Sequence, residues 1–164
     1  MFLTSLNDKI IKWVNVIIVL AMILLVVCIS LQITNRFVFK IPMPWTEEFA
    51  KYFFVWLAMF GSAKALREKS HIFVDVLEVL IKGRVARICT FIADAVCLIF
   101  SVTLLYVSIP WTWTNFSIAT ESVPALNMGL FCLCIPVASA LMVLFGTEVF
   151  MQRFKSRPEE EGGK

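Results

Sequence analysis

Histidine is almost absent from this sequence of 164 residues, because His71 is the only one. A membrane b-type haem needs two axial imidazoles, so this chain cannot supply both. No group of histidine, cysteine and acidic residues has metal-ligand spacing, and neither a glycine-rich phosphate loop nor a Gly-x-Ser-x-Gly motif occurs. We therefore expect no enzyme activity, no cofactor and no metal site.

Charge is also scarce. Only 16% of the residues are charged while 60% are hydrophobic, and the mean hydropathy is +0.85. Such a chain cannot be solvated as a compact soluble domain, so lipid is its expected solvent. The five cysteines lie inside apolar stretches without the spacing of a disulfide framework. The basic residues cluster beside apolar stretches, which gives no support for nucleic-acid binding.

The apolar stretches predict an all-α integral membrane protein with four transmembrane helices, since a bilayer core needs about 20 apolar residues per helix. The expected spans cover approximately residues 13–35, 46–67, 88–111 and 122–147, within a single membrane domain of residues 1–157. Pro136 should interrupt the fourth span near residue 132. Residues 158–164 form an expected disordered tail.

A further short helix is expected between the second and third spans, over about residues 71–82. Its polar residues recur at steps of four, three and four: His71, Asp75, Glu78 and Lys82. This pattern predicts an amphipathic helix that lies at the membrane surface, because the segment is too short to span.

Lysine and arginine gather on one side of the expected spans. They precede the first span, separate the second from the third, and follow the fourth: Lys9, Lys12, Lys64, Arg67, Lys69, Lys82, Arg84, Arg87, Arg153, Lys155 and Arg157. The positive-inside rule then predicts a multi-pass protein with both termini in the cytoplasm.

Apart from these basic residues, few charged groups lie inside the spans or at their ends. Asp94 is the only acid well inside one, and we expect it to be paired near the cytoplasmic interface or, alternatively, to serve in an ion or proton relay. Glu47, Glu48 and Lys51 open the second span. They either stabilise the helix locally or face a second protein.

Trp56, in mid-span, should pack against another helix of the chain or of a partner, because its indole N–H needs an acceptor.

One part of the sequence resembles a known family. The similarity is carried by Pro44-Trp45-Thr46-Glu47-Glu48, then Lys51, Phe54-Val55-Trp56, Gly61, Ala63, Lys69-Ser70-His71-Ile72 and Asp75. This pattern is similar to the small membrane subunit, DctQ type, of tripartite ATP-independent periplasmic (TRAP) transporters. It departs at Lys51, where an arginine is more usual. An arginine could bind a carboxylate through two N–H groups at once.

The resemblance implies a transporter of the bacterial inner membrane, in which a periplasmic binding protein delivers an organic acid to a two-part permease driven by a sodium gradient. The large membrane subunit would hold the substrate and ion sites, and this chain would be a fixed scaffold. It implies a stable complex with the large subunit and a transient one with the binding protein. The residues expected to contact the partner subunit are Glu47, Glu48, Lys51, Trp56, His71 and Asp75.

Two alternatives from other classes remain open at the level of sequence. A stand-alone four-helix cation or multidrug exporter would depend on a carboxylate inside a span, for which Asp94 is the candidate. An assembly subunit of another membrane complex would have the same hydropathy.

Overall fold

The computed structural model describes residues 2–41, 43–80 and 84–155, and their regular structure is helical apart from one isolated bridge between Ala119 and Asn127. The elements in chain order are α1 (Phe2–Thr34), the π-helical turn η1 (Asn35–Phe39), α2 (Pro44–Leu80), α3 (Arg84–Asn115), α4 (Met128–Cys132) and α5 (Cys134–Lys155). The prediction of an all-α protein is therefore confirmed. The expected tail at 158–164 lies outside the described residues.

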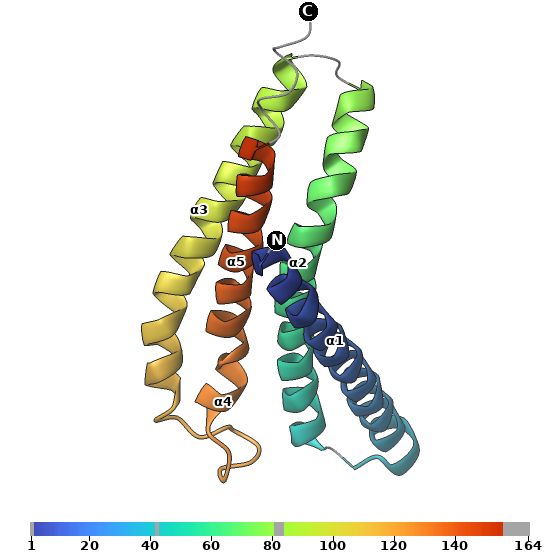
Figure 1. The fold of residues 1–164 in the computed structure, drawn as a ribbon. Coiled ribbons are helices and arrows are strands. Elements are labelled where there is room, and N and C mark those ends of the chain that lie inside the picture. Colours follow the sequence, from blue (N-terminus) through green and yellow to red (C-terminus); the bar gives the residue numbers. More distant parts are fainter. Residues whose placement is uncertain (1, 42, 81–83, 156–164) are drawn as a thin grey trace, which may run out of the picture.

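The long helices lie side by side in the order α1, α2, α5, α3 (Figure 1). Helix α1 packs on α2, α2 on α5, and α5 on α3, whereas α1 meets α5 and α2 meets α3 over short stretches. One end of the molecule carries the α1–α2 and α3–α4 connections, and we call it the loop end. The other end of the part in which all four long helices pack together lies near residues 7, 67 and 148, and we call it the terminal end; α2 and α3 extend beyond it (Figure 1). The result is an open layer of helices with two broad faces.

The two outer helices each touch the layer along one narrow line. On α1 the buried residues Asn7, Val14, Ala21 and Cys28 recur every seven positions. Such a repeat keeps one seam facing a neighbour as two helices wind gently around each other. On α3 the buried residues Ser101, Ser108 and Asn115 have the same spacing, and their small or polar side chains let α5 approach closely. Most of the remaining side chains of α1 and α3 point outward.

Among the described residues, three helical segments are long and apolar enough to cross a bilayer: Asn7–Phe39, Phe91–Asn115 and Met128–Met151. Helix α2 does not join them because Lys51 and Lys64 lie within its apolar part. It nevertheless lies between α1 and α5, so protein covers two of its sides. That α2 is a fourth span stays a prediction.

The structure corrects the expectation of a separate surface helix at residues 71–82. Helix α2 continues without interruption from Pro44 to Leu80. Residues 67–70, Arg-Glu-Lys-Ser, contain neither glycine nor proline, so nothing in the backbone forces a break there. Residues 81–83, and the side chains of the predicted polar stripe, lie outside what the structure describes.

The fourth apolar segment also begins later than expected, at Met128 rather than near Ser122. Residues 116–127 instead form a folded loop, in which the Thr120 N–H donates to Leu126 O (2.9 Å) and the Met128 N–H donates to Ile118 O (2.9 Å). The helix is then interrupted at Leu133, between α4 and α5, which confirms the break predicted from Pro136.

Gly129 permits the close contact between α4 and this loop. A Cβ atom at position 129 would lie 2.6 Å from Phe116 Cγ and 2.7 Å from backbone atoms of the same residue. By contrast, a Cβ at Gly61 would have nothing within 4 Å. The glycine at 129 is thus required by packing inside the chain, and the one at 61 is not.

We expect Gly129→Ala to destabilise the purified protein by about 1–3 kcal/mol, because the backbone of Phe116 cannot move aside cheaply. Gly61→Ala is the matched control, and it should be neutral or stabilising by up to about 1 kcal/mol. Thermal unfolding in mild detergent measures both. Equal midpoints for the two variants would contradict this account of the loop.

Candidate functional site

Glu48, at the loop end, is turned toward the chain itself. Its Oε1 accepts hydrogen bonds from the Tyr52 hydroxyl (2.7 Å) and the Glu121 N–H (3.1 Å), and its Oε2 accepts one from the Ser122 N–H (2.8 Å). The Tyr52 ring stacks on Phe131, with centroids 4.2 Å apart and planes at 8°. Glu48 therefore fastens the α3–α4 loop to the first turns of α2.

Glu47 points elsewhere, although it is the preceding residue. Its carboxylate pairs with Lys51 at 2.9 Å, and both side chains are largely exposed, at 56% and 70% respectively. The pair borders a shallow groove between α1 and α2, lined also by Leu25, Ile29, Gln32, Ala50 and Phe54. Such an exposed pair contributes little to folding, so it leaves a cation and an anion on an outer face.

Trp56 lies half-buried and its indole Nε1 donates to Phe131 O at 2.9 Å. The prediction that this indole finds an acceptor in another helix is confirmed. The next carbonyl along the chain, Cys132 O, has no backbone donor, because Pro136 lacks the N–H that would bond to it. The Thr112 hydroxyl donates to that carbonyl instead, at 3.5 Å. Side chains from α2 and α3 thus bond two successive carbonyls at the break between α4 and α5.

The other predicted residues are placed as follows. The side chains of His71 and Asp75 lie outside those that the structure describes. Asp94 is half-buried on α3, in line with the buried Ser101 and Ser108 that face α5. Within the described residues, no group of three or more His, Cys, Asp or Glu side chains could hold a metal ion. The structure does not bring Asp94 and the Glu47–Lys51 pair together, because α5 separates α2 from α3 over most of their length.

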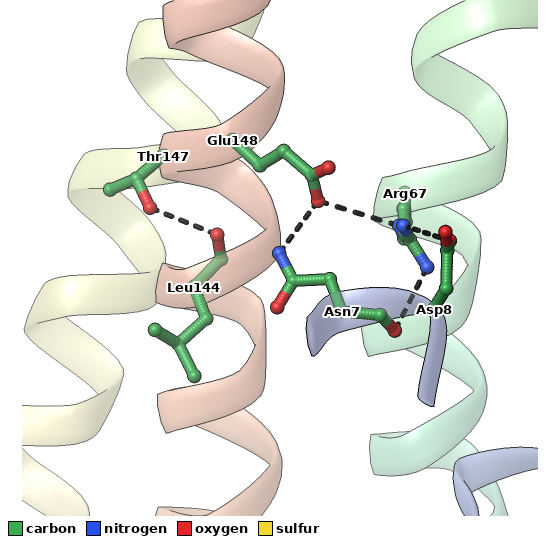
Figure 2. A network of polar contacts seen from close by, with 6 residues as sticks. All are labelled: Asn7, Asp8, Arg67, Leu144, Thr147 and Glu148. Carbon is green, nitrogen blue, oxygen red and sulfur yellow. Dashed lines mark hydrogen bonds and ion pairs between the residues drawn. The ribbon is translucent and has the colours of Figure 1, made fainter. Parts of the chain in front are cut away.

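A polar network at the terminal end was not predicted (Figure 2). The Arg67 guanidinium donates to Asn7 O (3.0 Å) and Asp8 Oδ1 (2.7 Å), and its Nε lies 3.5 Å from Glu148 Oε2. The Asn7 amide donates to the same Glu148 oxygen at 2.6 Å. Arg67 also lies over the Phe145 ring, 5.5 Å from its centroid. The network joins α1, α2 and α5.

Two features of the sequence could have indicated this network. Glu148 is an acid directly after a long apolar run, on the side where basic residues gather, and Arg67 ends the second apolar segment on the same side. A carboxylate there needs a cationic or hydrogen-bonding partner. What the sequence could not indicate is that Asn7 completes the network, since this depends on how α1 crosses α2.

Comparison with known proteins gives one consistent result. The family model for "Tripartite ATP-independent periplasmic transporters, DctQ component" matches residues 25–156. The sialic acid TRAP transporter permease protein SiaT of Haemophilus influenzae (strain 86-028NP) is 26% identical over 112 residues, which are 68% of this chain and 18% of that protein. A second Haemophilus influenzae protein, whose name describes a TRAP transporter small permease protein, is 29% identical over 114 residues, or 70% of this chain and 68% of that protein.

A third relative comes from Vibrio cholerae. Its C4-dicarboxylate TRAP transporter small permease protein DctQ is 30% identical over 74 residues, which are 45% of this chain and 32% of that protein. The chain therefore spans less than a fifth of the first relative's length and about a third of the Vibrio protein's.

We expect Arg67→Met to destabilise the chain by about 3–5 kcal/mol, because the buried Glu148 carboxylate loses its cation. The double variant Arg67→Met/Glu148→Met should recover much of that loss. Lys64→Met, one turn away, breaks only an exposed i,i+4 pair with Glu68 and should change stability by less than about 1 kcal/mol. Unfolding in detergent measures all three, and a double variant no more stable than Arg67→Met would rule out a coupled network.

Glu48→Gln should loosen the α3–α4 loop, because an amide cannot accept three hydrogen bonds as strongly as a carboxylate does. Glu47→Gln, its neighbour, should leave the loop unchanged. Limited proteolysis and hydrogen exchange of residues 116–127 in detergent compare the two. Faster exchange in the Glu47 variant than in the Glu48 variant would contradict this assignment.

Proposed function

Since this chain belongs to the DctQ family of TRAP transporter components, we propose that it is the small scaffold subunit of a secondary transporter that imports an organic acid. The family match over residues 25–156 carries the proposal. DctQ-family subunits are components of transporters, so the chain is a transport protein of the membrane and not an enzyme.

The break between α4 and α5 supports a scaffold role rather than a transport pathway. In secondary transporters, discontinuous helices offer free backbone carbonyls to coupling ions and helix N-termini to anionic substrates. Here Phe131 O and Cys132 O at the break already accept hydrogen bonds from Trp56 and Thr112. These two carbonyls are therefore committed to holding helices together.

The partner we propose is a large membrane subunit. In the sialic acid relative, the part aligned with this chain makes up only 18% of a single permease polypeptide. Further permease sequence is thus covalently joined to a domain similar to this one in that protein. We propose that this chain forms a stable complex with a corresponding large permease subunit.

The same family supports our proposal for the substrate class and the energy source. The relatives' names mention sialic acid and C4-dicarboxylates, both of which carry carboxylate groups. The proposed transporter therefore takes an organic acid from a periplasmic binding protein, and a sodium gradient drives it in place of ATP. The distribution of basic residues supports a bacterial inner-membrane location with both termini in the cytoplasm.

The geometry narrows the proposed contact residues. Of the six, Glu48 and Trp56 bond to atoms of this chain, and the side chains of His71 and Asp75 are not described. Glu47 and Lys51 are the described members that lie largely exposed. We therefore assign the first contact with the large subunit to this pair.

Reconstitution in proteoliposomes tests the function directly. With the large subunit and the binding protein present, uptake of a labelled carboxylic acid should require both this chain and an inward sodium gradient. This chain alone should carry nothing, because the carbonyls at the break between α4 and α5 already accept hydrogen bonds within the chain.

Two outcomes would contradict the proposed scaffold role. Transport by this chain alone that disappears in Asp94→Asn would favour the exporter alternative and refute the scaffold role. Full uptake by the large subunit and the binding protein without this chain would refute it as well.

A further inference from the structure

The outer face of α3 has the character of a surface covered by lipid. Its exposed side chains are large and apolar, with Phe100 61% exposed and Ile99 67% exposed. Others on the same helix are Phe91, Ile92 and Val96. Bulky hydrocarbon side chains hold a neighbouring helix backbone at a distance, and acyl chains can pack around them without loss.

The outer face of α2 is different. Glu47, Lys51, Phe54, Ala58 and Gly61 follow one another at steps of four, three, four and three, and we call them the α2 seam. The first four are exposed and Gly61 is partly exposed. This spacing is the heptad pattern with which one helix meets another along a single line. The same spacing already joins α1 to α2 on another side of that helix.

Gly61 shows that the seam is not used inside this chain. A Cβ at Gly146 would meet Leu98 at 3.2 Å and one at Gly129 would meet Phe116, so the structure explains both of those glycines. At Gly61 nothing lies within 4 Å. A glycine within a helix costs about 1 kcal/mol relative to alanine. Among the residues that the structure describes, no contact at Gly61 compensates that cost, whereas the close approach of an external helix would.

The charged and polar side chains on this face distinguish lipid from a protein helix as the group that covers it. The Glu47–Lys51 pair lies at the loop-end margin of the groove formed with α1, and the groove also contains the amide of Gln32. Glu47 and Lys51 pair with each other, but acyl chains offer no further hydrogen-bond partner to this pair or to the Gln32 amide. A protein helix with polar groups at this level can complement all three and place its apolar part against Phe54, Ala58 and Gly61.

We propose that a transmembrane helix of the large permease subunit packs along the α2 seam, with its polar end against Glu47 and Lys51. The inference rests on the proposed function, since it places the partner named there on one face of this chain. The face of α3 is then left to lipid.

Site-specific photo-crosslinking tests the location. Phe54 on the seam is 60% exposed and Phe100 on α3 is 61% exposed, so a photoreactive phenylalanine analogue at either position is a matched pair. In membranes containing both subunits, irradiation should join the large subunit to position 54 and not to position 100. A crosslink at position 100 alone, a homodimer of this chain at position 54, or lipid adducts at both positions would overturn the proposal.

A second pair of variants tests the close approach. Gly61→Leu fills space that this chain leaves open, so the chain should fold while recovery of the large subunit on a tagged small subunit falls about tenfold, equivalent to about 1.4 kcal/mol of binding. Ala93→Leu, on the exposed face of α3, should leave recovery unchanged. Equal recovery with both variants overturns the seam. No large subunit with the unmodified chain would instead refute the proposed function.

Discussion

Hydrogen bonding without water is the constraint on which this structure depends. In a bilayer an unpaired polar group costs several kcal/mol, so each break in a helix must be satisfied by the protein itself. The interruption at Leu133 is the clearest case, because Pro136 removes a backbone donor and the next helices supply side chains in its place. Trp56 and Thr112 thereby fix α2 and α3 against the fourth apolar segment. The interruption of the fourth apolar segment is thus the point at which side chains of α2 and α3 bond to it.

At the two ends of the layer, charged side chains provide the hydrogen-bond partners for polar groups of the chain. At the loop end the Glu48 carboxylate accepts bonds from the backbone of the α3–α4 loop, and at the terminal end Arg67 gathers the carboxylates of Asp8 and Glu148. Between these ends α1 packs on α2 mainly through apolar side chains and α3 packs on α5 through small or polar ones, and the buried residues of both outer helices follow seven-residue repeats. Polar interactions join different helices at both ends of the layer and at the break between α4 and α5. Such an arrangement suits a rigid support more than a moving part.

Much of the fold follows from hydropathy, because lipid imposes a simple rule on segment length. The apolar segments and the helical class were predictable on that basis, and the break near residue 132 was predictable from Pro136. The continuity of α2 was not, because a polar stripe indicates which face meets water but not whether the backbone bends before it. The late start at Met128 depends on a loop whose hydrogen bonds pair residues 118–120 with 126–128, and hydropathy carries no information on such pairing.

The candidate site shows the same division between local and distant information. The Glu47–Lys51 pair follows from i,i+4 spacing alone, whereas the partners of Glu48 lie 73 and 74 residues away along the chain. Successive residues on a helix point about 100° apart, so two adjacent glutamates cannot serve the same neighbour. One of them therefore closes the chain's own loop while the other remains outside. On this geometry the two glutamates of Trp45-Thr46-Glu47-Glu48 have different roles, and folding does not explain the role of the exposed Glu47.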